Sequence, residues 1–454
     1  MGKKYRFYNQ HQTMLLPLNI QKWLPKGHLA AFISDVVDEL DLIQIFAYYE
    51  DEERGAPPYD PRMMTKVLFY SYCIGVTASR KIEKKLHEDI AFRYLAAGNF
   101  PDFRTISDFR KIHIDTLEDL FVQVLLLCDA VGLVKLGTVS LDGMKVEANA
   151  SLQKTKKYET LCKEEEQLRE MVREILKDAE QIDREEDRLF GEDNRGDELP
   201  PGFQNKKERL KRIREAKEQL EKEQEKLHDE YQKNLRRRDE KEKTTGKKIR
   251  GRKPHPVLKK PGEKLKGNTT DPDSRIMKTR KGFIQGYNGQ AIVDADSQII
   301  VAGDLVQDEN DKHQQIHMVE KLKQYLDRIP EKLTMDAGYW DEQRLKQLDD
   351  DIDLYVATDK DWKERKKMRN CPSPRGRIPK NLSYKERMER KLLTKRGKEI
   401  YQKRGCSVEP VFGQIQNRGL RRLLLRGLTK AKGEWLLMCL SHNLLKLWRA
   451  QATK

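Results

Sequence analysis

The chain has 454 residues, a length that predicts about two to four domains with ample hydrophobic core. Hydrophobic residues make up 37%, charged residues make up 36%, and the formal net charge is +16. This basic balance favours an anionic partner, either nucleic acid or an acidic membrane surface, over a merely soluble chain. The longest apolar stretch, residues 120–134, is interrupted by Gln123 and Asp129 and is too short to cross a bilayer. We therefore expect a cytoplasmic protein without a membrane span.

Residues 1–130 carry helical signals and are predicted to form an amino-terminal DNA-binding domain. Asp60 and Pro61 mark a helix start, with a capping side chain followed by proline at the first helical position. A second helix is predicted over 79–97 and a third over 105–128. Helix, turn and helix with basic side chains suit a DNA-binding module, and the alternative is a packing or dimerisation domain. The basic residues expected to contact DNA here are Arg80, Lys84, Arg104 and Arg110.

Residues 152–240 consist almost entirely of charged side chains, glutamine and leucine, and they predict a helical hairpin. A stretch with glycines and prolines at 191–203 separates the two halves and predicts a turn. Two heptad-patterned helices joined by a turn form an antiparallel coiled coil, with arms of roughly 45–50 Å. We expect a solvated arm or a dimer contact without chemistry of its own. The apolar residues with seven-residue spacing are Leu161, Leu168, Ile175, Ile182 and Leu189, then Ile213, Leu220 and Leu227.

Two further segments are rich in lysine and arginine. Residues 241–281 also contain several glycines and prolines, which predicts a flexible basic segment suited to phosphate contacts, or else a plain linker. Residues 359–404 form a second basic insertion, immediately before a helix expected to open near Glu409.

The remaining sequence, 136–151 and 282–448, predicts a split catalytic core. A strand ends at Asp142, and after the insertion a β-hairpin, a helix, a strand ending at Asp336, a helix and another strand follow before the Glu409 helix. Without its insertions, this order is that of an RNase H-like mixed sheet, in the α+β or α/β class. In that fold the two strand-end aspartates and the helix glutamate converge.

Three convergent carboxylates suit divalent metal ions, because Mg²⁺ prefers hard oxygen ligands and keeps several waters. Two such ions can activate an attacking water or 3′-hydroxyl and stabilise the leaving oxygen, so no side-chain nucleophile is required. Other acids could replace one of the three, and a histidine pair at i, i+4 spacing is either a metal site or a packed or solvated pair. These competitors are Asp271, Asp273 and Asp294, with His313 and His317 as the pair.

Several motifs resemble those of DDE transposases from bacterial insertion sequences. The run Asp-Gly-Met-Lys-Val-Glu-Ala-Asn-Ala-Ser at 142–151 is similar to the first-aspartate motif, and Tyr-Asn-Gly-Gln at 287–290 to the family's Tyr-Asn-x-Gln. Met-Asp-Ala-Gly-Tyr at 335–339 resembles the second motif. Tyr401 and Arg404, with Val-Glu-Pro-Val-Phe-Gly at 408–413, resemble the third. Tyr-Asp-Pro-Arg-Met at 59–63 and Thr-Ile-Ser-Asp-Phe-Arg at 105–110 are similar to the amino-terminal domain of these proteins.

The resemblance implies a bacterial, nucleoid-associated transposase that binds terminal inverted repeats, cuts there and joins the freed 3′-hydroxyl to target DNA. It implies two Mg²⁺ ions, replaceable by Mn²⁺, on Asp142, Asp336 and Glu409. It also implies DNA contacts from Tyr401 and Arg404. Asn288 and Gln290 support the site, contact DNA or only satisfy backbone groups. A homodimer is expected, since two DNA ends must be held. Alternatives are an RNase H-like nuclease without strand transfer and a non-catalytic DNA-binding derivative.

The chain departs from the family pattern in two places. The spacing from Arg404 to Glu409 is one residue longer than in the commonest signature. Many relatives have a basic residue seven positions after the catalytic glutamate, where this chain has Gln416. The expected DNA contact then passes to Arg418, Arg421 or Arg422.

Overall fold

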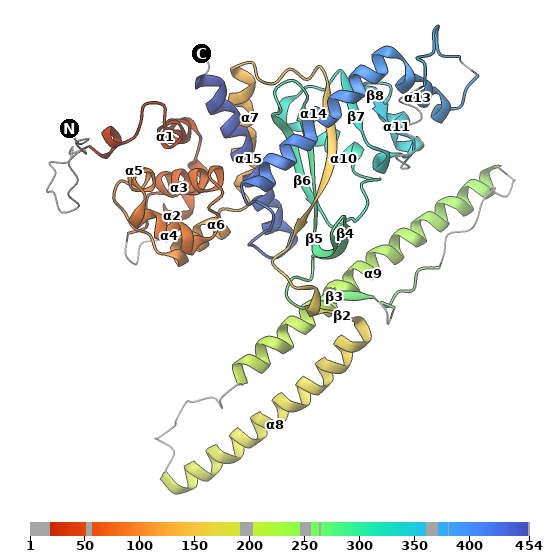
Figure 1. The fold of residues 1–454 in the computed structure, drawn as a ribbon. Coiled ribbons are helices and arrows are strands. Elements are labelled where there is room, and N and C mark those ends of the chain that lie inside the picture. The colour runs from red at the N-terminus through yellow and green to blue at the C-terminus, as the bar shows by residue number, and fades with distance from the viewer. Residues whose placement is uncertain are drawn as a thin grey trace, which may run out of the picture.

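The computed structural model contains a helical amino-terminal part, a central mixed sheet covered by helices, and a long helical hairpin (Figure 1). The amino-terminal part packs beside the sheet, and the hairpin projects away from it. The residues that the structure describes are 19–50, 57–190, 203–245, 256–262, 265–359, 371–379 and 381–452.

The amino-terminal part is helical, as the sequence predicts. At α3, Asp60 caps the helix by accepting the backbone N–H groups of Arg62 and Met63, which confirms the predicted start. The single helix predicted over 79–97 is wrong, because Asp89 ends one helix and caps the next through the N–H of Ala91. The third predicted helix is also divided in two. The elements are a 3₁₀ turn η1 (Ile20–Trp23), α1 (Leu29–Glu39), α2 (Ile43–Glu50), α3 (Pro61–Cys73), α4 (Ser79–Glu88), α5 (Ile90–Leu95), α6 (Phe103–Ile112) and α7 (Leu117–Ala130).

The central sheet has six strands, in the order β4-β5-β1-β7-β8, with β6 also paired to β5. Strand β1 runs antiparallel to β5 along its whole length and parallel to β7, which is parallel to β8. This mixed sheet is compatible with the predicted RNase H-like core. The strands are β1 (Val139–Glu147), β4 (Arg275–Thr279), β5 (Gly282–Asp294), β6 (Ile300–Val306), β7 (Lys332–Met335) and β8 (Asp353–Val356).

Helices α14 (Lys395–Asn417) and α15 (Leu428–Ala452) pack on the sheet. Ser407 of α14 lies 2.7 Å from Ser140 of β1, oxygen to oxygen. In α15, Trp435 is fully buried against Gly289, where an added Cβ would come within 2.9 Å of its ring. The glycine therefore allows α15 to approach the strand closely. Helices α10 (Gln315–Leu326), α11 (Glu342–Leu348) and α13 (Tyr384–Leu393) complete the core.

Two expectations about the core need correction. Asp142 does not end its strand, because β1 continues to Glu147. Glu409 does not open its helix, because α14 begins at Lys395 and includes Pro410. The basic character of this segment hid the helix, since lysine and arginine also suit irregular phosphate-binding sequence.

The hairpin consists of α8 (Tyr158–Phe190) and α9 (Phe203–Thr245). Its buried apolar cluster lies near the sheet and contains members of both helices, whereas Leu227 of the predicted heptad series is 52% exposed. In Figure 1, α8 accompanies only the first part of α9, and α9 continues past a small sheet of β2 (Thr155–Lys157) and β3 (Lys266–Asn268). The cluster residues are Leu161, Leu168, Leu210, Ile213, Ala216 and Leu220.

The segment 241–281, predicted to be flexible, contains regular structure in its described parts. Strands β3 and β4 lie there, and α9 extends to Thr245. Asn268 donates to the backbone oxygen of Ser151, which ties the segment to the first part of the split core. Residues 246–255, 263–264 and 360–370 of the two basic segments lie outside the described residues. Among the described helices, none combines the length and apolar character needed to cross a membrane.

Candidate active site

Asp142 and Asp336 are brought together by the parallel pairing of β1 and β7. The pairs run from Val139 with Leu333 to Leu141 with Met335, so the next position on each strand is one of the two aspartates. Pairing ends there because Asp336 turns into a 3₁₀ segment, η3 (Ala337–Tyr339), and caps it by accepting the N–H of Gly338 at 2.7 Å. The two carboxyl groups therefore stand side by side where the strands part.

Glu409 reaches the same place through Arg404. The Arg404 Nη1 lies 2.7 Å from the Asp142 Oδ2, and its Nη2 lies 3.2 Å from the Glu409 Oε1. Arg404 and Glu409 both belong to α14 and lie five positions apart. The contact between Ser140 and Ser407 holds this helix against β1. One guanidinium thus bridges an acid of the sheet and an acid of the helix.

The electrostatics of this cluster are unfavourable for Asp142. Burial raises the pKa of its carboxyl group to about 6, and the neighbouring Asp336 adds to the rise, although Arg404 counteracts it. For Arg404, burial works against the charge, but the surrounding acids, Asp142 first, raise the guanidinium pKa. A site that disfavours its own negative charge gains from a cation.

The residues fit divalent metal ions by their chemistry. Asp142, Asp336 and Glu409 offer the hard carboxylate oxygens that Mg²⁺ prefers, and Asp142 and Glu409 already contact a cationic group, the Arg404 guanidinium. Within the described ranges, no three or more His, Cys, Asp or Glu side chains lie close enough together to hold one ion.

Asn288 and Gln290 have a partner that the sequence did not reveal, Asp311. Their side-chain amides donate to the Asp311 Oδ1 at 2.7 and 2.8 Å, and Lys145 lies 3.6 Å from the same oxygen. Tyr339 donates its hydroxyl to the Gln290 Oε1. These contacts place a further carboxylate beside the glycines that follow the two aspartates.

The space around Asp311 depends on these glycines. An added Cβ at Gly143 would come within 2.6 Å of the Asp311 Oδ1, and one at Gly338 would come within 2.8 Å of the Asp336 Oδ1. Asp311 lies in the polar loop after β6, and the sequence of this loop has no hydrophobic periodicity. The acidic residues near Asp311 in the sequence are the only signal that could have identified it as a site residue.

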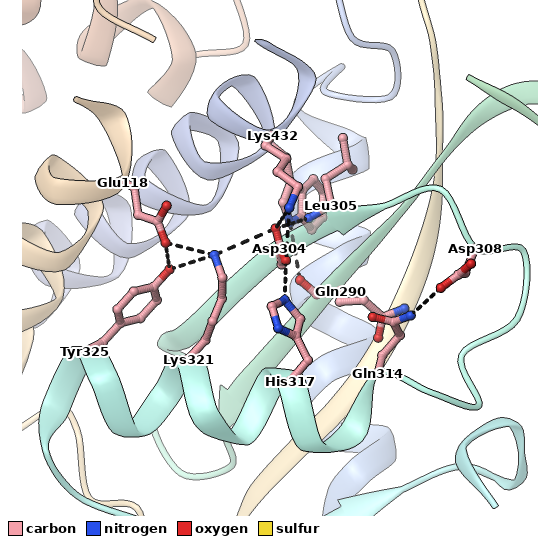
Figure 2. A network of polar contacts seen from close by, with 11 residues as sticks. Glu118, Gln290, Asp304, Leu305, Asp308, Gln314, His317, Lys321, Tyr325 and Lys432 are labelled. Carbon is pink, nitrogen blue, oxygen red and sulfur yellow. Dashed lines mark hydrogen bonds and ion pairs between the residues drawn. The ribbon is translucent and has the colours of Figure 1, made fainter. Parts of the chain in front are cut away.

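The loop that carries Asp311 leads into α10, and a polar network anchors this helix (Figure 2). Asp304 of β6 is almost fully buried and contacts His317 at 2.5 Å, Lys432 at 3.2 Å and Lys321 at 3.8 Å. Burial disfavours the charge on Asp304, but these contacts outweigh it and lower the pKa of the carboxyl group to about 2. The network ties α10 to β6 and α15. Gln314, at the start of the helix, holds Asp308 of the loop at 2.8 Å.

Two family models match separate parts of the chain. A family model described as Transposase domain (DUF772) matches residues 18–112, and one described as Transposase DDE domain matches residues 368–448. The chain is related to the DDE-class transposases of insertion sequences. The DDE domain match includes Arg404 and Glu409, and the other covers most of the amino-terminal helices. Comparison with curated proteins gave no match, and neither did comparison with solved structures.

The competing acids have structural partners in this transposase relative. Asp271 accepts the hydroxyl of Tyr287 at 2.9 Å, and Asp294 accepts the backbone N–H groups of Lys135 and Leu136. His317 contacts Asp304, whereas His313 lies 4.0 Å from Asp341, so the histidine pair does not share one partner.

Some residues predicted to contact DNA are not on the surface. Arg110 is 4% exposed and donates to the Tyr72 hydroxyl and the Thr77 oxygen, so its predicted DNA contact is wrong. Arg418 is half-buried and donates to Ser441 of α15, which turns it away from solvent. Arg110 and Arg418 each lie at an interface between elements. The pattern of charge along the sequence does not distinguish such an interface from an exposed surface.

The DNA contacts predicted for the other residues stay predictions. Arg80, Lys84 and Arg104 are exposed on packed helices α4 and α6, and Arg80 lies over the ring of Phe103. Arg421 is exposed and donates to the backbone oxygen of Gln416. Arg404 has its guanidinium between Asp142 and Glu409, and Tyr401 lies one helical turn before it.

Proposed function

We propose that this protein is a transposase that binds the ends of its own element, cuts phosphodiester bonds there and joins the freed 3′-hydroxyl to target DNA. The two transposase domains support a transposase function in general. The observation that carries the specific proposal is the side-by-side placement of Asp142 and Asp336, with Glu409 joined to Asp142 through Arg404.

In this proposal Asp142, Asp336 and Glu409 hold two Mg²⁺ ions, or Mn²⁺ in their place. When bound, such ions supply Lewis acidity at the phosphate and lower the pKa of an attacking water. In the cut, a water oxygen bonds to phosphorus and the bond to the 3′ oxygen breaks, which leaves a 3′-hydroxyl and a 5′-phosphate.

The chain's own groups orient the DNA in this scheme. Arg404 exchanges its two carboxylate partners for a phosphate, because a guanidinium binds phosphate oxygens through the same paired N–H groups. Tyr401 lies one helical turn away and contacts the same strand. Asn288 and Gln290 position Asp311 beside β1. The amino-terminal helices contact the element end, and two copies of the chain hold two ends.

The test is incubation of the protein with duplexes carrying candidate element ends, in Mg²⁺ or Mn²⁺, with analysis of cut and joined products. We expect both products from the wild type and neither from Asp142→Ala. Because loss of a residue that only supports a metal ligand already costs about 10–100-fold, loss of a ligand should cost more. The matched control is Asp350→Ala, an exposed aspartate remote from the site, which should retain activity.

Three outcomes would overturn parts of the proposal. Cut products without joined products would favour the alternative, an RNase H-like nuclease without strand transfer. Activity that survives Asp142→Ala would remove the site assignment itself. Binding without any cutting would favour a non-catalytic DNA-binding derivative.

A further inference from the structure

Residues 421–426, here named the arginine strap, connect α14 to α15 and lie along the edge of β1. Strand β5 covers one edge of β1 throughout, and β7 covers the other edge only as far as Leu141. At the far end of that second edge the strap pairs with Glu147, which donates its N–H to the Arg421 oxygen and accepts the N–H of Leu423. Asp142 therefore lies on the stretch of β1 between β7 and the strap.

The strap is held rigidly by buried carboxylates. Glu434, fully buried on α15, accepts the backbone N–H groups of Leu424 and Leu425 at 2.8 and 2.9 Å. Immediately after the strap, Asp271 and Asp273 accept the N–H groups of residues 427 and 428. Since backbone N–H groups bonded to buried acids are costly to release, the strap keeps its shape in the absence of a ligand.

Three arginines project outward from this support. Arg421, Arg422 and Arg426 are exposed, while the leucines between them are buried or half-buried. Asn149 orients two of the three, because its Oδ1 accepts from Arg422 at 3.3 Å and its backbone oxygen accepts from Arg426 at 3.2 Å. Its own amide donates to the Leu424 oxygen at 2.7 Å, so Asn149 fastens both the strap and its guanidinium groups.

These guanidinium groups are not neutralised inside the described part of the chain. None of the three forms an ion pair there, in contrast to Arg404, which has two carboxylate partners. Glu147 contacts the strap through its backbone, and its carboxylate forms no ion pair with these arginines in the same ranges. Guanidinium groups that lie on a fixed backbone and form no ion pair with a carboxylate of the protein are suited to binding an anionic ligand.

We propose that the arginine strap is a preformed binding site for backbone phosphates of duplex DNA, with Asn149 as its positioning residue. The proposal deepens the proposed function, on which it rests for the identity of the DNA. Glu147 lies five positions after Asp142 on β1, a distance of about 17 Å along an extended strand. At roughly 3.4 Å per nucleotide, the strap contacts phosphates about five nucleotides from the bond that is cut.

The first experiment measures affinity for a labelled duplex of arbitrary sequence, without divalent ions, over a series of salt concentrations. The test variant changes Arg421, Arg422 and Arg426 to glutamine together. Each lost phosphate contact should lower the salt slope by about one, so we expect a fall of about two to three and a Kd about 10–100-fold higher at low salt.

The matched control carries the same charge change on exposed positions of α9, with Lys233, Arg236 and Arg237 changed to glutamine. We expect its salt slope to fall by less than one. Equal slopes for the two triple variants would overturn the proposal, because net charge alone would then explain the effect. Unchanged melting temperatures would exclude unfolding as the cause in either variant.

The second variant, Asn149→Ala, separates orientation from charge. All three arginines remain, so the salt slope should stay near the wild-type value while the Kd rises about 3–10-fold through loss of preorganisation. Wild-type affinity in this variant would remove Asn149 from the proposal.

A third experiment fixes the location of the contact. Single neutral methylphosphonates are placed along a duplex with a cleavable end, and binding is measured position by position. Substitution about five nucleotides from the cut should weaken the wild type but leave the triple variant unaffected. An effect of the same size in both proteins would place the strap elsewhere. If no DNA is cut but binding still depends on the strap, the strap proposal stands and the proposed function fails.

Discussion

The hairpin and the core each bury a glutamate, and the two are satisfied in different ways. Glu165 of α8 is 6% exposed and contacts Arg169, Arg214 and Lys217 within 3.2 Å, all on the hairpin itself. Glu434 of α15 is fully buried and accepts the Tyr72 hydroxyl at 2.9 Å as well as two backbone N–H groups of the strap.

The difference shows what charge means in each region. In the hairpin, acids and bases neutralise one another locally, so abundant charge leaves little unsatisfied. In the core, Glu434 joins the amino-terminal helices, α15 and the strap, and the guanidinium of Arg110 completes the network through Tyr72 at 3.1 Å. Buried charge in the core therefore determines how separate parts of the molecule are held, and three exposed arginines on the strap are left for a ligand.

The largest effect should come from the core glutamate. Glu434→Leu leaves two backbone N–H groups, a buried hydroxyl and the buried Arg110 without their acid, so we expect the free energy of unfolding to fall by about 3–5 kcal/mol. Urea titration followed by circular dichroism measures the change. Tyr72→Phe removes one of these contacts and serves as the graded control, with an expected loss of about 1 kcal/mol. A loss in Glu434→Leu no larger than in the control would contradict the network.

Asp142 of the candidate site should show a pH-dependent effect of intermediate size. The pKa of Asp142 is raised to about 6, so the folded state binds its proton more tightly than the unfolded state. Ionisation therefore costs stability as the pH rises, with no cost below the ordinary aspartate pKa and the full cost above about 6. In EDTA, Asp142→Asn should be more stable than the wild type by about 2–3 kcal/mol at about pH 8 and equal to it at about pH 4. Urea titrations at both values measure this.

The matched comparison for that prediction is Asp350→Asn, at an exposed position. It should change stability little, and by the same amount at both pH values. If Asp142→Asn behaved in the same pH-independent manner, the rise in the Asp142 pKa, which comes first from burial and then from Asp336, would be refuted.

The smallest effect should come from the hairpin glutamate. Glu165→Gln weakens charged contacts that lie within one hairpin, so we expect a local loss of about 1–2 kcal/mol. Hydrogen exchange of α8 and α9 amides measures it, and protection in the core should not change. Glu159→Gln, which removes an exposed i, i+4 pair with Lys163, should lower the protection of these amides less than Glu165→Gln does. Lost protection in the core would mean that the hairpin is not self-contained.

The sequence anticipated many elements whose signals are local. Asp60 and Pro61 start α3 as expected, and the hairpin of β5 and β6, the strand before Asp336 and the two long insertion helices are all present. The helix predicted over 79–97 is wrong, because an aspartate that accepts its neighbour's N–H can divide an otherwise helical pattern. Capping competes with helix continuation, and hydrophobic periodicity does not predict whether the helix continues or ends.

The site was anticipated in part. The pairing of β1 with β7 places Asp142 and Asp336 together, and Arg404 links Glu409 to Asp142, while the assignment of their catalytic and metal-binding roles stays a prediction. Arg110 was misjudged, because a basic residue near other basic residues can serve a buried acid as readily as a phosphate. Asp311 was missed, because its partners Asn288 and Gln290 lie on another strand.

By itself the sequence determined the periodicity of the hairpin, the order of strands and helices, and the positions of the acids, since each depends on neighbours along the chain. Only the tertiary structure decided that Arg404 joins Asp142 to Glu409, that Arg110 is buried, and that Arg421, Arg422 and Arg426 share a fixed strap beside β1. These facts depend on burial and on contacts between distant segments. The same arginine binds an internal acid or an external phosphate according to which of them the fold brings within reach.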